Sequence, residues 1–244
     1  MDLKPLAVAS WFLFVLSAVG CDHPLQEPLS NPEVPLGPNL LAAEIRRSET
    51  EPRVEESLSQ LLEQAGSVPG VEAVAITDIL PGVAWRREDL RAIRRDGSQN
   101  PTAAHVRVIS PAYFETMEIR LLEGRLFSER DDPNGTAVAI VSETYAKKNW
   151  PEGSPLGKRL NLDNGPVWFT IVAVVQDGPK AEGLSVVYLP FMQSGFQARP
   201  RPARFVLARI AGDPKATAGA LQKATGQEFR SLQAWAESRA GANR

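Results

Sequence analysis

Chemically reactive side chains occur throughout the sequence, but few of them stand at spacings that would build a catalytic or ligand-binding site. The run Gly153–Arg159, GSPLGKR, partly matches a phosphate-binding loop, in which backbone N–H groups surround a phosphate and a Ser or Thr holds magnesium. The run has one residue too few between its glycines, and Arg159 stands at the magnesium-binding position. Because Pro151 and Pro155 also stiffen the segment, we interpret it as a turn.

Three carboxylates, Glu129, Asp131 and Asp132, lie close enough in the sequence to suggest a cation site. They lack the glycine-centred ligand spacing of a calcium loop, so a solvated turn is the better interpretation. We expect Arg125 to pair with Asp131 or Asp132 within this turn.

The remaining candidates for metal binding or catalysis are isolated. The two histidines, His23 and His105, do not have a spacing that indicates a metal pair. Serines are numerous, but the sequence contains no Gly-x-Ser-x-Gly nucleophile elbow. We therefore predict no catalytic residue, no metal ligand and no cofactor, and we do not expect an enzyme.

One run is rich in charge of both signs. Its members are Arg86, Arg87, Glu88, Asp89, Arg91, Arg94, Arg95 and Asp96. Because the signs are mixed, we interpret the run as a solvated face or hairpin loop. The alternative is a docking surface for an acidic partner.

The N-terminus, Met1–Gly20, has the pattern of an export signal. Lys4 supplies a positive charge, and the apolar stretch after it is shorter than the about 20 residues that span a bilayer. The residues Leu16–Cys21, LSAVGC, resemble a bacterial lipobox, although Ala18 stands where leucine is usual. This resemblance implies that Cys21, the only cysteine, carries a lipid anchor. The alternatives are an ordinary signal peptide with an incidental cysteine, or an uncleaved anchor.

Residues 21–38 are predicted to form a tether between the lipid and the folded part of the chain. Prolines at 24, 28, 32, 35 and 38 forbid a helix and favour an extended, semi-rigid conformation. In many Gram-negative bacteria, an aspartate after the lipidated cysteine favours retention in the inner membrane, and Asp22 stands there.

The rest of the composition is that of a globular protein. Hydrophobic residues make up 43% and charged residues 23%, so the core is not expected to be disordered. The net charge of −2 argues against nucleic acid as a main partner, because phosphate binding needs a basic face. The length allows one large domain or two small ones.

Strand and helix patterns alternate at both ends of the folded part. Near its start we predict a strand at 40–45, a helix and a strand at 71–76. The helix is expected to begin at a capping box, Ser48 and Glu51, with Pro52 in its first turn, and to stop at Gly66. This order predicts a parallel strand pair with a right-handed crossover. Near the C-terminus we predict a strand at 204–210, a helix from Pro214 to Ala224 and a last short strand at 229–235.

The middle of the chain holds short elements with clear boundaries. Ser110 is expected to cap a helix that begins at Pro111. Ala137–Val141 is an apolar run typical of a buried strand, and Ser142 is expected to cap a helix that Pro151 must end. A further buried strand is predicted at 169–175.

These middle elements also carry a family resemblance. The series SPAYFETMEIRLLEGRLF, AIVSETYAKKNWPEGSPLGKRL, IVAVVQD and VYLPFMQ resembles the periplasmic core domain of MacB-type ABC transporter permeases, in matching order from Asn39 onward. The resemblance implies an α+β fold of two lobes. A porter-like lobe, 39–85 and 200–244, would consist of two strand-helix-strand halves packed side by side. A mixed, strand-rich lobe, 86–199, would be inserted between them.

In the resembled permeases this domain lies between the first and second membrane helices and relays ATP-driven motion to adaptor proteins or substrate. Here we expect the signal sequence to take the place of the first helix, and we expect neither a second membrane helix nor a nucleotide-binding domain. The resemblance therefore implies a non-enzymatic, lipid-anchored module on the periplasmic side of the inner membrane. It would act through protein contacts, as an accessory or orphan efflux component beside a separate ABC permease, ATPase or membrane-fusion adaptor.

An alternative hypothesis is a periplasmic binding module for a lipid, a lipoprotein or a hydrophobic small molecule. Its ligand would occupy a cleft between the two lobes, which is a usual place for a binding site.

Overall fold

Short strands and brief helices make up most of the computed structural model, which describes residues 39–45, 54–81, 90–98, 100–179, 181, 183–196 and 204–241. The predicted signal peptide (1–20), Cys21 and the predicted tether (21–38) lie outside the described residues. All of the described elements belong to one compact unit, Asn31–Arg244.

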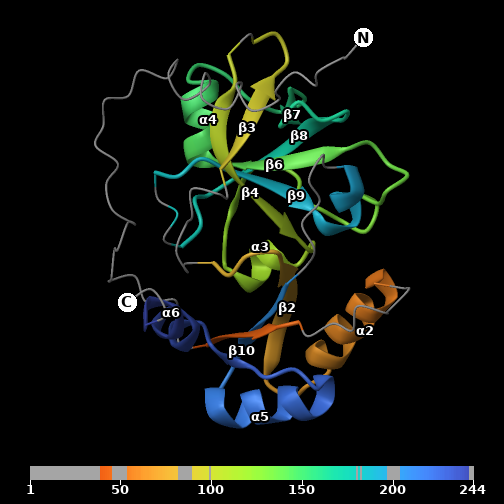
Figure 1. Cartoon of the computed structure of the whole chain (residues 1–244), viewed down its shortest axis with the longest axis vertical. Helices are drawn as coiled ribbons and strands as arrows, with labels where there is room; N and C mark the ends of the chain where they lie inside the picture. Colours follow the sequence, from red (N-terminus) through yellow and green to blue (C-terminus); the bar gives the residue numbers. More distant parts are fainter. Residues whose placement is uncertain are drawn as a thin grey trace, which may run out of the picture. The chain divides into compact units, whose positions relative to one another are not determined.

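The first lobe combines elements from both ends of the described chain. Its strands are β1 (Leu40–Glu44), β2 (Val71–Thr77), β10 (Phe205–Ile210) and β11 (Arg230–Ser231). Its helices are α2 (Val54–Gly66), α5 (Pro214–Thr225) and α6 (Leu232–Gly241). The strands run in the order β11-β1-β10-β2, and each is antiparallel to its neighbour. This is the split βαβ arrangement, drawn in the lower half of Figure 1.

This strand order corrects two expectations. β1 and β2 were expected to pair in parallel, but β10 lies between them and hydrogen-bonds to both. The two strand-helix-strand halves therefore interleave instead of packing side by side. The physical reason is burial: β10 is buried along almost its whole length, and the central position covers both of its edges and both of its faces.

The C-terminal strand is also shorter than expected. β11 has only two residues, and the predicted strand at 229–235 continues as helix α6 instead. The Ser231 hydroxyl accepts from the Ala234 N–H at 3.1 Å, which favours the helical turn. Trp235 then lies across the sheet, where its indole N–H donates to the Ala42 carbonyl at 2.9 Å.

The two faces of the first lobe's sheet are buried against different partners. On one face, α2 and α5 cover alternate residues of β1, β2 and β10. The N-terminus of α5 forms as predicted, because the Asp213 carboxylate accepts from the backbone N–H groups of Lys215 and Ala216. Gly226, at φ +70°, ends this helix. The opposite face packs against α6 and the second lobe.

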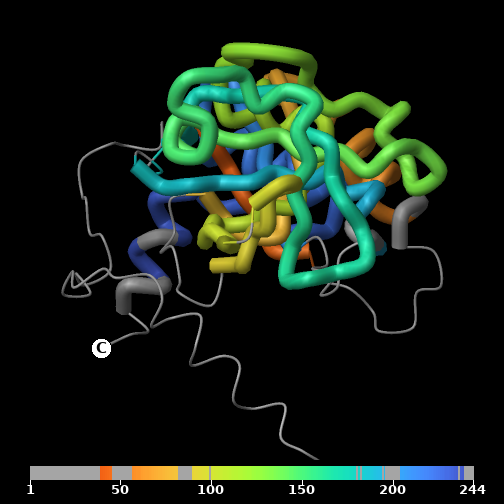
Figure 2. The backbone as a smooth tube through the Cα atoms, turned by 90° about the horizontal axis from the view of Figure 1, so that it is seen from above, coloured from red at the N-terminus to blue at the C-terminus, as the bar shows by residue number. Residues whose placement is uncertain are grey.

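The second lobe is a closed barrel built from the middle of the chain. Its strands are β3 (Leu90–Arg95), β4 (Thr102–Ile109), β6 (Val138–Ser142), β7 (Arg159–Leu162), β8 (Trp168–Val175) and β9 (Val186–Pro190). The order β4-β3-β7-β8-β6-β9 closes on itself because β9 pairs in parallel with β4. Segments distant in sequence therefore lie together, as the yellow, green and cyan parts of Figure 2 show. A further strand, β5 (Leu121–Gly124), pairs with β8.

Short helices pack beside this barrel. The sequence correctly predicted the cap of one of them and wrongly predicted the cap of another. Helix α4 (Glu143–Asn149) follows β6, and the Ser142 hydroxyl accepts from the Tyr145 N–H as predicted. Helix α3 (Tyr113–Thr116) has no side-chain cap, so the prediction for Ser110 was wrong. The Ser110 hydroxyl accepts from the Ile76 N–H of β2 at 2.9 Å instead. A 3₁₀ helix, η3 (Phe191–Phe196), follows β9.

One apolar core joins the two lobes. It contains Leu40, Ala75 and Phe205 from the first lobe together with Phe114 and Tyr188 from the second. Polar contacts accompany this core. The Asp78 carboxylate, after β2, accepts from the Val108 N–H of β4 at 3.0 Å. Arg209 of β10 donates to the Thr116 carbonyl at 2.8 Å, at the end of α3. The two lobes are thus packed on each other as parts of one body.

Candidate functional site

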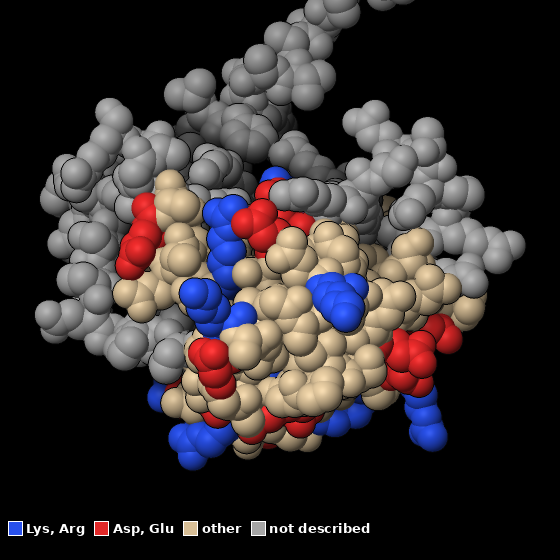
Figure 3. All heavy atoms as spheres, turned by 90° about the horizontal axis from the view of Figure 1, so that it is seen from below, with Lys and Arg blue, Asp and Glu red and all other residues tan. Residues whose placement is uncertain are grey.

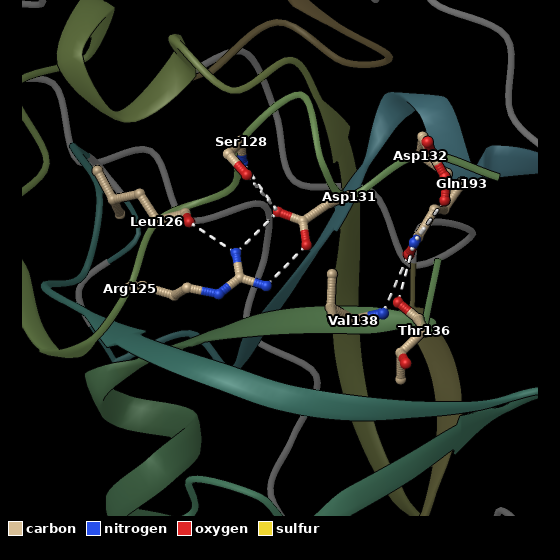
Figure 4. Close-up of polar contacts among 8 residues, drawn as sticks. All are labelled: Arg125, Leu126, Ser128, Asp131, Asp132, Thr136, Val138 and Gln193. Carbon is tan, nitrogen blue, oxygen red and sulfur yellow. Dashed lines mark hydrogen bonds and ion pairs between the residues drawn. The ribbon is translucent and has the colours of Figure 1, made fainter. Parts of the chain in front are cut away.

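The acidic turn between β5 and β6 holds a built ion pair. Arg125 donates to both carboxylate oxygens of Asp131, at 2.7 and 2.8 Å, and to the carbonyl of Leu126 (Figure 4). The side chain of Asp131 is 5% exposed, whereas that of Arg125 is 52% exposed. The carboxylate also accepts from the Ser128 N–H at 2.8 Å. The expected pairing of Arg125 is confirmed, with Asp131 as its partner.

These contacts set the charge state of the pair. Burial disfavours the ionised form of Asp131, but hydrogen bonds from Arg125 and Ser128 outweigh it and lower the pKa of this carboxyl. The hydrogen bond to Asp131 likewise raises the pKa of the Arg125 guanidinium. Both groups are therefore charged at neutral pH, and their geometry is that of a structural ion pair.

Gln193 of η3 fixes the other end of the same turn. Its amide nitrogen donates to the carbonyls of Asp132 and Thr136, at 2.9 and 3.0 Å, and its amide oxygen accepts from the Val138 N–H (Figure 4). The Gln193 side chain is buried. No local sequence pattern indicates this role, because the partners of Gln193 lie more than fifty residues earlier in the chain.

Within the described residues, no three His, Cys, Asp or Glu side chains come close enough together to hold a metal ion. His105 is buried in β4, and His23 lies outside the described residues. Asp132 accepts from the Asn134 N–H, in a local turn. The Asp131 carboxylate, as described above, is directed at Arg125.

The segment Gly153–Arg159 is a turn, as expected. The Gly157 N–H donates to the Ile171 carbonyl at 2.9 Å, and the Lys158 N–H donates to the Pro155 carbonyl at 3.0 Å. These backbone N–H groups are directed at carbonyls of the protein, so they do not form the cradle that a phosphate needs.

The charge-rich run is described from residue 90 onward, and its members at 86–89 lie outside the described residues. Arg91 pairs with Asp163 at 2.6 Å, and Arg95 donates to the Asn149 carbonyl at 3.0 Å. Arg94 is exposed and donates to the Asn164 side chain. In the described part of the run, the expected solvated face fits Arg94, whereas Arg91 and Arg95 are partly buried on β3.

A buried polar cluster near the junction was not foreseen from the sequence. Arg107 of β4 is only 2% exposed, and its charge acts on the phenols of Tyr113 and Tyr188. Burial raises the pKa of both phenols, and the nearby Arg107 opposes that rise. Both tyrosines are therefore neutral at physiological pH, and both belong to the apolar core that joins the two lobes.

The surface hollow next to β5 was also not foreseen from the sequence. It has a volume of about 430 Å³ and lies between β5 and α4. Six of its lining residues are Leu122, Glu123, Glu143, Lys147, Trp150 and Val174. The lining combines apolar and charged side chains, which suits contact with another molecule better than chemistry.

The described surface carries mixed charge. The face drawn in Figure 3 shows Lys and Arg interspersed with Asp and Glu on a mostly uncharged surface. Among the described helices, none combines the length and apolar character needed to cross a membrane.

The fold and these sites define an α+β domain in which a barrel is packed on a split βαβ lobe. The chain matches the family described as "MacB-like periplasmic core domain" over residues 26–227, and it belongs to this family.

Curated relatives match over part of the chain. The chain is 31% identical over 100 residues to the uncharacterized ABC transporter permease YknZ of Bacillus subtilis, covering 40% of this chain and 25% of that protein. It is 31% identical over 108 residues to the macrolide export ATP-binding/permease protein MacB of Marinobacter nauticus, covering 43% of this chain and 16% of that protein. The matches thus span a quarter or less of these relatives.

Solved structures share the fold. The periplasmic region of MacB from Actinobacillus actinomycetemcomitans superimposes with a TM-score of 0.56 at 15% identity, covering 84% of this chain and 94% of that one. The extracellular domain of the ABC-type transporter YknZ from Gram-positive bacteria gives a TM-score of 0.54 at 20% identity, covering 79% of this chain and 98% of that one.

Proposed function

We propose that this protein is a non-enzymatic, lipid-anchored periplasmic module that acts through protein contacts, as an accessory or orphan component of an efflux system. One observation carries the proposal. The chain covers 94% and 98% of two solved extracytoplasmic transporter domains, while its matches span a quarter or less of whole permeases. What it shares with them is the extracytoplasmic domain.

The proposed anchor is a lipid on Cys21, after removal of the signal peptide at 1–20. The sequence Leu16–Cys21 supports it, and Asp22 favours the inner membrane. The Pro-rich tether, 21–38, would hold a porter-like lobe (39–85 and 200–244) and an inserted lobe (86–199) away from the bilayer.

The proposed partner is a separate ABC permease and ATPase, or a membrane-fusion adaptor. The relatives named as permease and ATP-binding proteins support this class of partner. Nucleic acid, a metal and an organic cofactor form no part of the proposed function.

The alternative, a binding module for a lipid, lipoprotein or hydrophobic small molecule, has less support. Such a ligand was expected between the lobes, where Phe114, Tyr188 and Phe205 instead share one apolar core. Native mass spectrometry of the protein purified from membranes tests this alternative. A non-covalent small molecule of constant mass, beyond the acyl chains expected on Cys21, would favour it, and the absence of such a molecule would count against it.

The anchor is tested by comparing wild type with Cys21→Ser. We expect wild-type protein in the inner-membrane fraction, with a mature N-terminus at Cys21 whose mass includes acyl chains. The Cys21→Ser protein should lose that mass and leave the membrane fraction. An unmodified Cys21, or equal membrane retention of both proteins, would contradict the lipid anchor.

A further inference from the structure

Strand β5 is short and exposed at all four of its residues. Leu121 and Leu122 are 41% and 46% exposed, an unusual position for two adjacent leucines. In the described part of the chain, β5 pairs with β8 alone, so its second edge has no strand beside it. An open edge of this kind offers backbone N–H and C=O groups to an added strand.

A bulge adapts this strand to the hollow beside it. The pairing register of β5 with β8 passes from Leu121–Val175 to Glu123–Val174, which leaves Leu122 without a partner. In a regular strand, consecutive side chains point to opposite faces, whereas a bulge can direct neighbours to the same side. Leu122 and Glu123 accordingly both line the hollow of about 430 Å³ between β5 and α4.

The charges among the residues that line the hollow favour a basic occupant. Glu143 is paired with Lys147 at 2.5 Å within α4, so these two charges balance each other. Glu123 accepts a hydrogen bond from the Ser154 hydroxyl at 2.5 Å, and no cation in the described part of the chain pairs with it. The lining therefore carries an excess negative charge on Glu123, and it also contains the apolar residues Trp150 and Val174.

We propose that the open edge of β5 and the adjoining hollow form a docking site for an extended, basic segment of a partner protein. The segment adds as a strand along β5, seats one apolar side chain against Leu122 and Trp150, and places a Lys or Arg beside Glu123. Its relevance to efflux rests on the proposed function, but binding of the segment itself does not.

The test uses the full-length protein, purified from whichever cell fraction contains it, and two fluorescein-labelled octapeptides. One alternates Lys and Val, and the other alternates Glu and Val. By fluorescence anisotropy we expect the Lys–Val peptide to bind at least about tenfold more tightly than the Glu–Val peptide. Hydrogen-exchange mass spectrometry should show protection by the Lys–Val peptide at residues 119–125 and along α4.

Matched variants locate the site. Leu122→Glu should weaken binding of the Lys–Val peptide by about tenfold or more, and Glu123→Gln by about threefold. Leu90→Glu changes another exposed leucine, 39% exposed on β3, and should leave binding unchanged. Equal binding of both peptides, protection elsewhere, or unchanged binding by Leu122→Glu would overturn the proposal.

A second copy of this chain is the competing occupant. Sedimentation of the wild type as a dimer, lost in Leu122→Glu, would overturn the proposal in favour of self-association. A failure of peptide binding leaves the proposed function open to its own tests, because the lipid on Cys21 and the contact with a transporter are measured separately.

Discussion

At Arg125, a half-exposed guanidinium meets a nearly buried carboxylate in bidentate geometry. We predict that Arg125→Ala lowers the free energy of unfolding by about 1–2 kcal/mol. In this variant the Asp131 carboxylate still accepts the hydrogen bond from the Ser128 N–H, but it has lost its charged partner. Urea unfolding measures this loss. The control is Arg204→Ala, whose pair with Glu44 is 3.5 Å long and exposed, and whose expected loss is about 0.5 kcal/mol or less. Equal losses would contradict the structural role of Arg125.

The same pair predicts a pH dependence. The folded protein lowers the pKa of Asp131 below its ordinary value of 3.8, so the ionised carboxyl stabilises the fold. This contribution is complete above about pH 5 and is lost as the pH falls through 3.8 toward the folded-state pKa. The stability advantage of wild type over Asp131→Asn should shrink over that window. A difference that stays constant from pH 6 to pH 2.5 would argue against this assignment.

At the scale of elements, the close approach of β5 to β8 requires a glycine at position 124. Its φ is +85°, and a Cβ at this position would lie 2.0 Å from the Val172 carbonyl oxygen. We predict that Gly124→Ala destabilises the fold by more than about 3 kcal/mol, because backbone atoms cannot move aside cheaply. Gly157→Ala is the control: its φ is +73°, but its Cβ would meet nothing within 4 Å. It should cost about 1 kcal/mol. Thermal unfolding of both variants makes the comparison, and similar losses would contradict it.

Elements with strong local signals could be predicted from the sequence. The apolar run before Ser142, the cap itself and Pro151 after the helix together define β6 and α4. These signals depend on residues that are neighbours in the chain, so the elements form as predicted.

Features set by distant contacts could not be predicted. The Ser110 hydroxyl could cap its own helix, but instead it accepts a hydrogen bond from the Ile76 N–H, 34 residues earlier. The insertion of β10 between β1 and β2 depends on pairing between the two ends of the chain. The hollow beside β5 could not be predicted for a similar reason, because the bulge at Leu122 exists only in the register of β5 with β8. The family resemblance, in contrast, correctly indicated two lobes.

At the scale of the whole molecule, the shared core predicts one cooperative unfolding transition. Phe114 is fully buried in the core that spans both lobes. The centroid of its ring lies 5.1 Å from the centroid of the Tyr188 ring. Phe114→Ala should cost about 3–5 kcal/mol. Hydrogen exchange in denaturant should show β10 and β6 losing protection together, in this variant and in wild type. Separate transitions for the two strands would show that the lobes are independent.

The proposed module acts through protein contacts, so the proposal requires a partner. The most direct measurement is crosslinking in intact cells, followed by purification of this protein and mass spectrometry, for wild type and Cys21→Ser. We predict recovery of an ABC permease, its ATPase or a membrane-fusion adaptor with wild type, and a loss or strong reduction with Cys21→Ser. Recovery of the lipid-modified protein alone would contradict its role as an anchored transporter component.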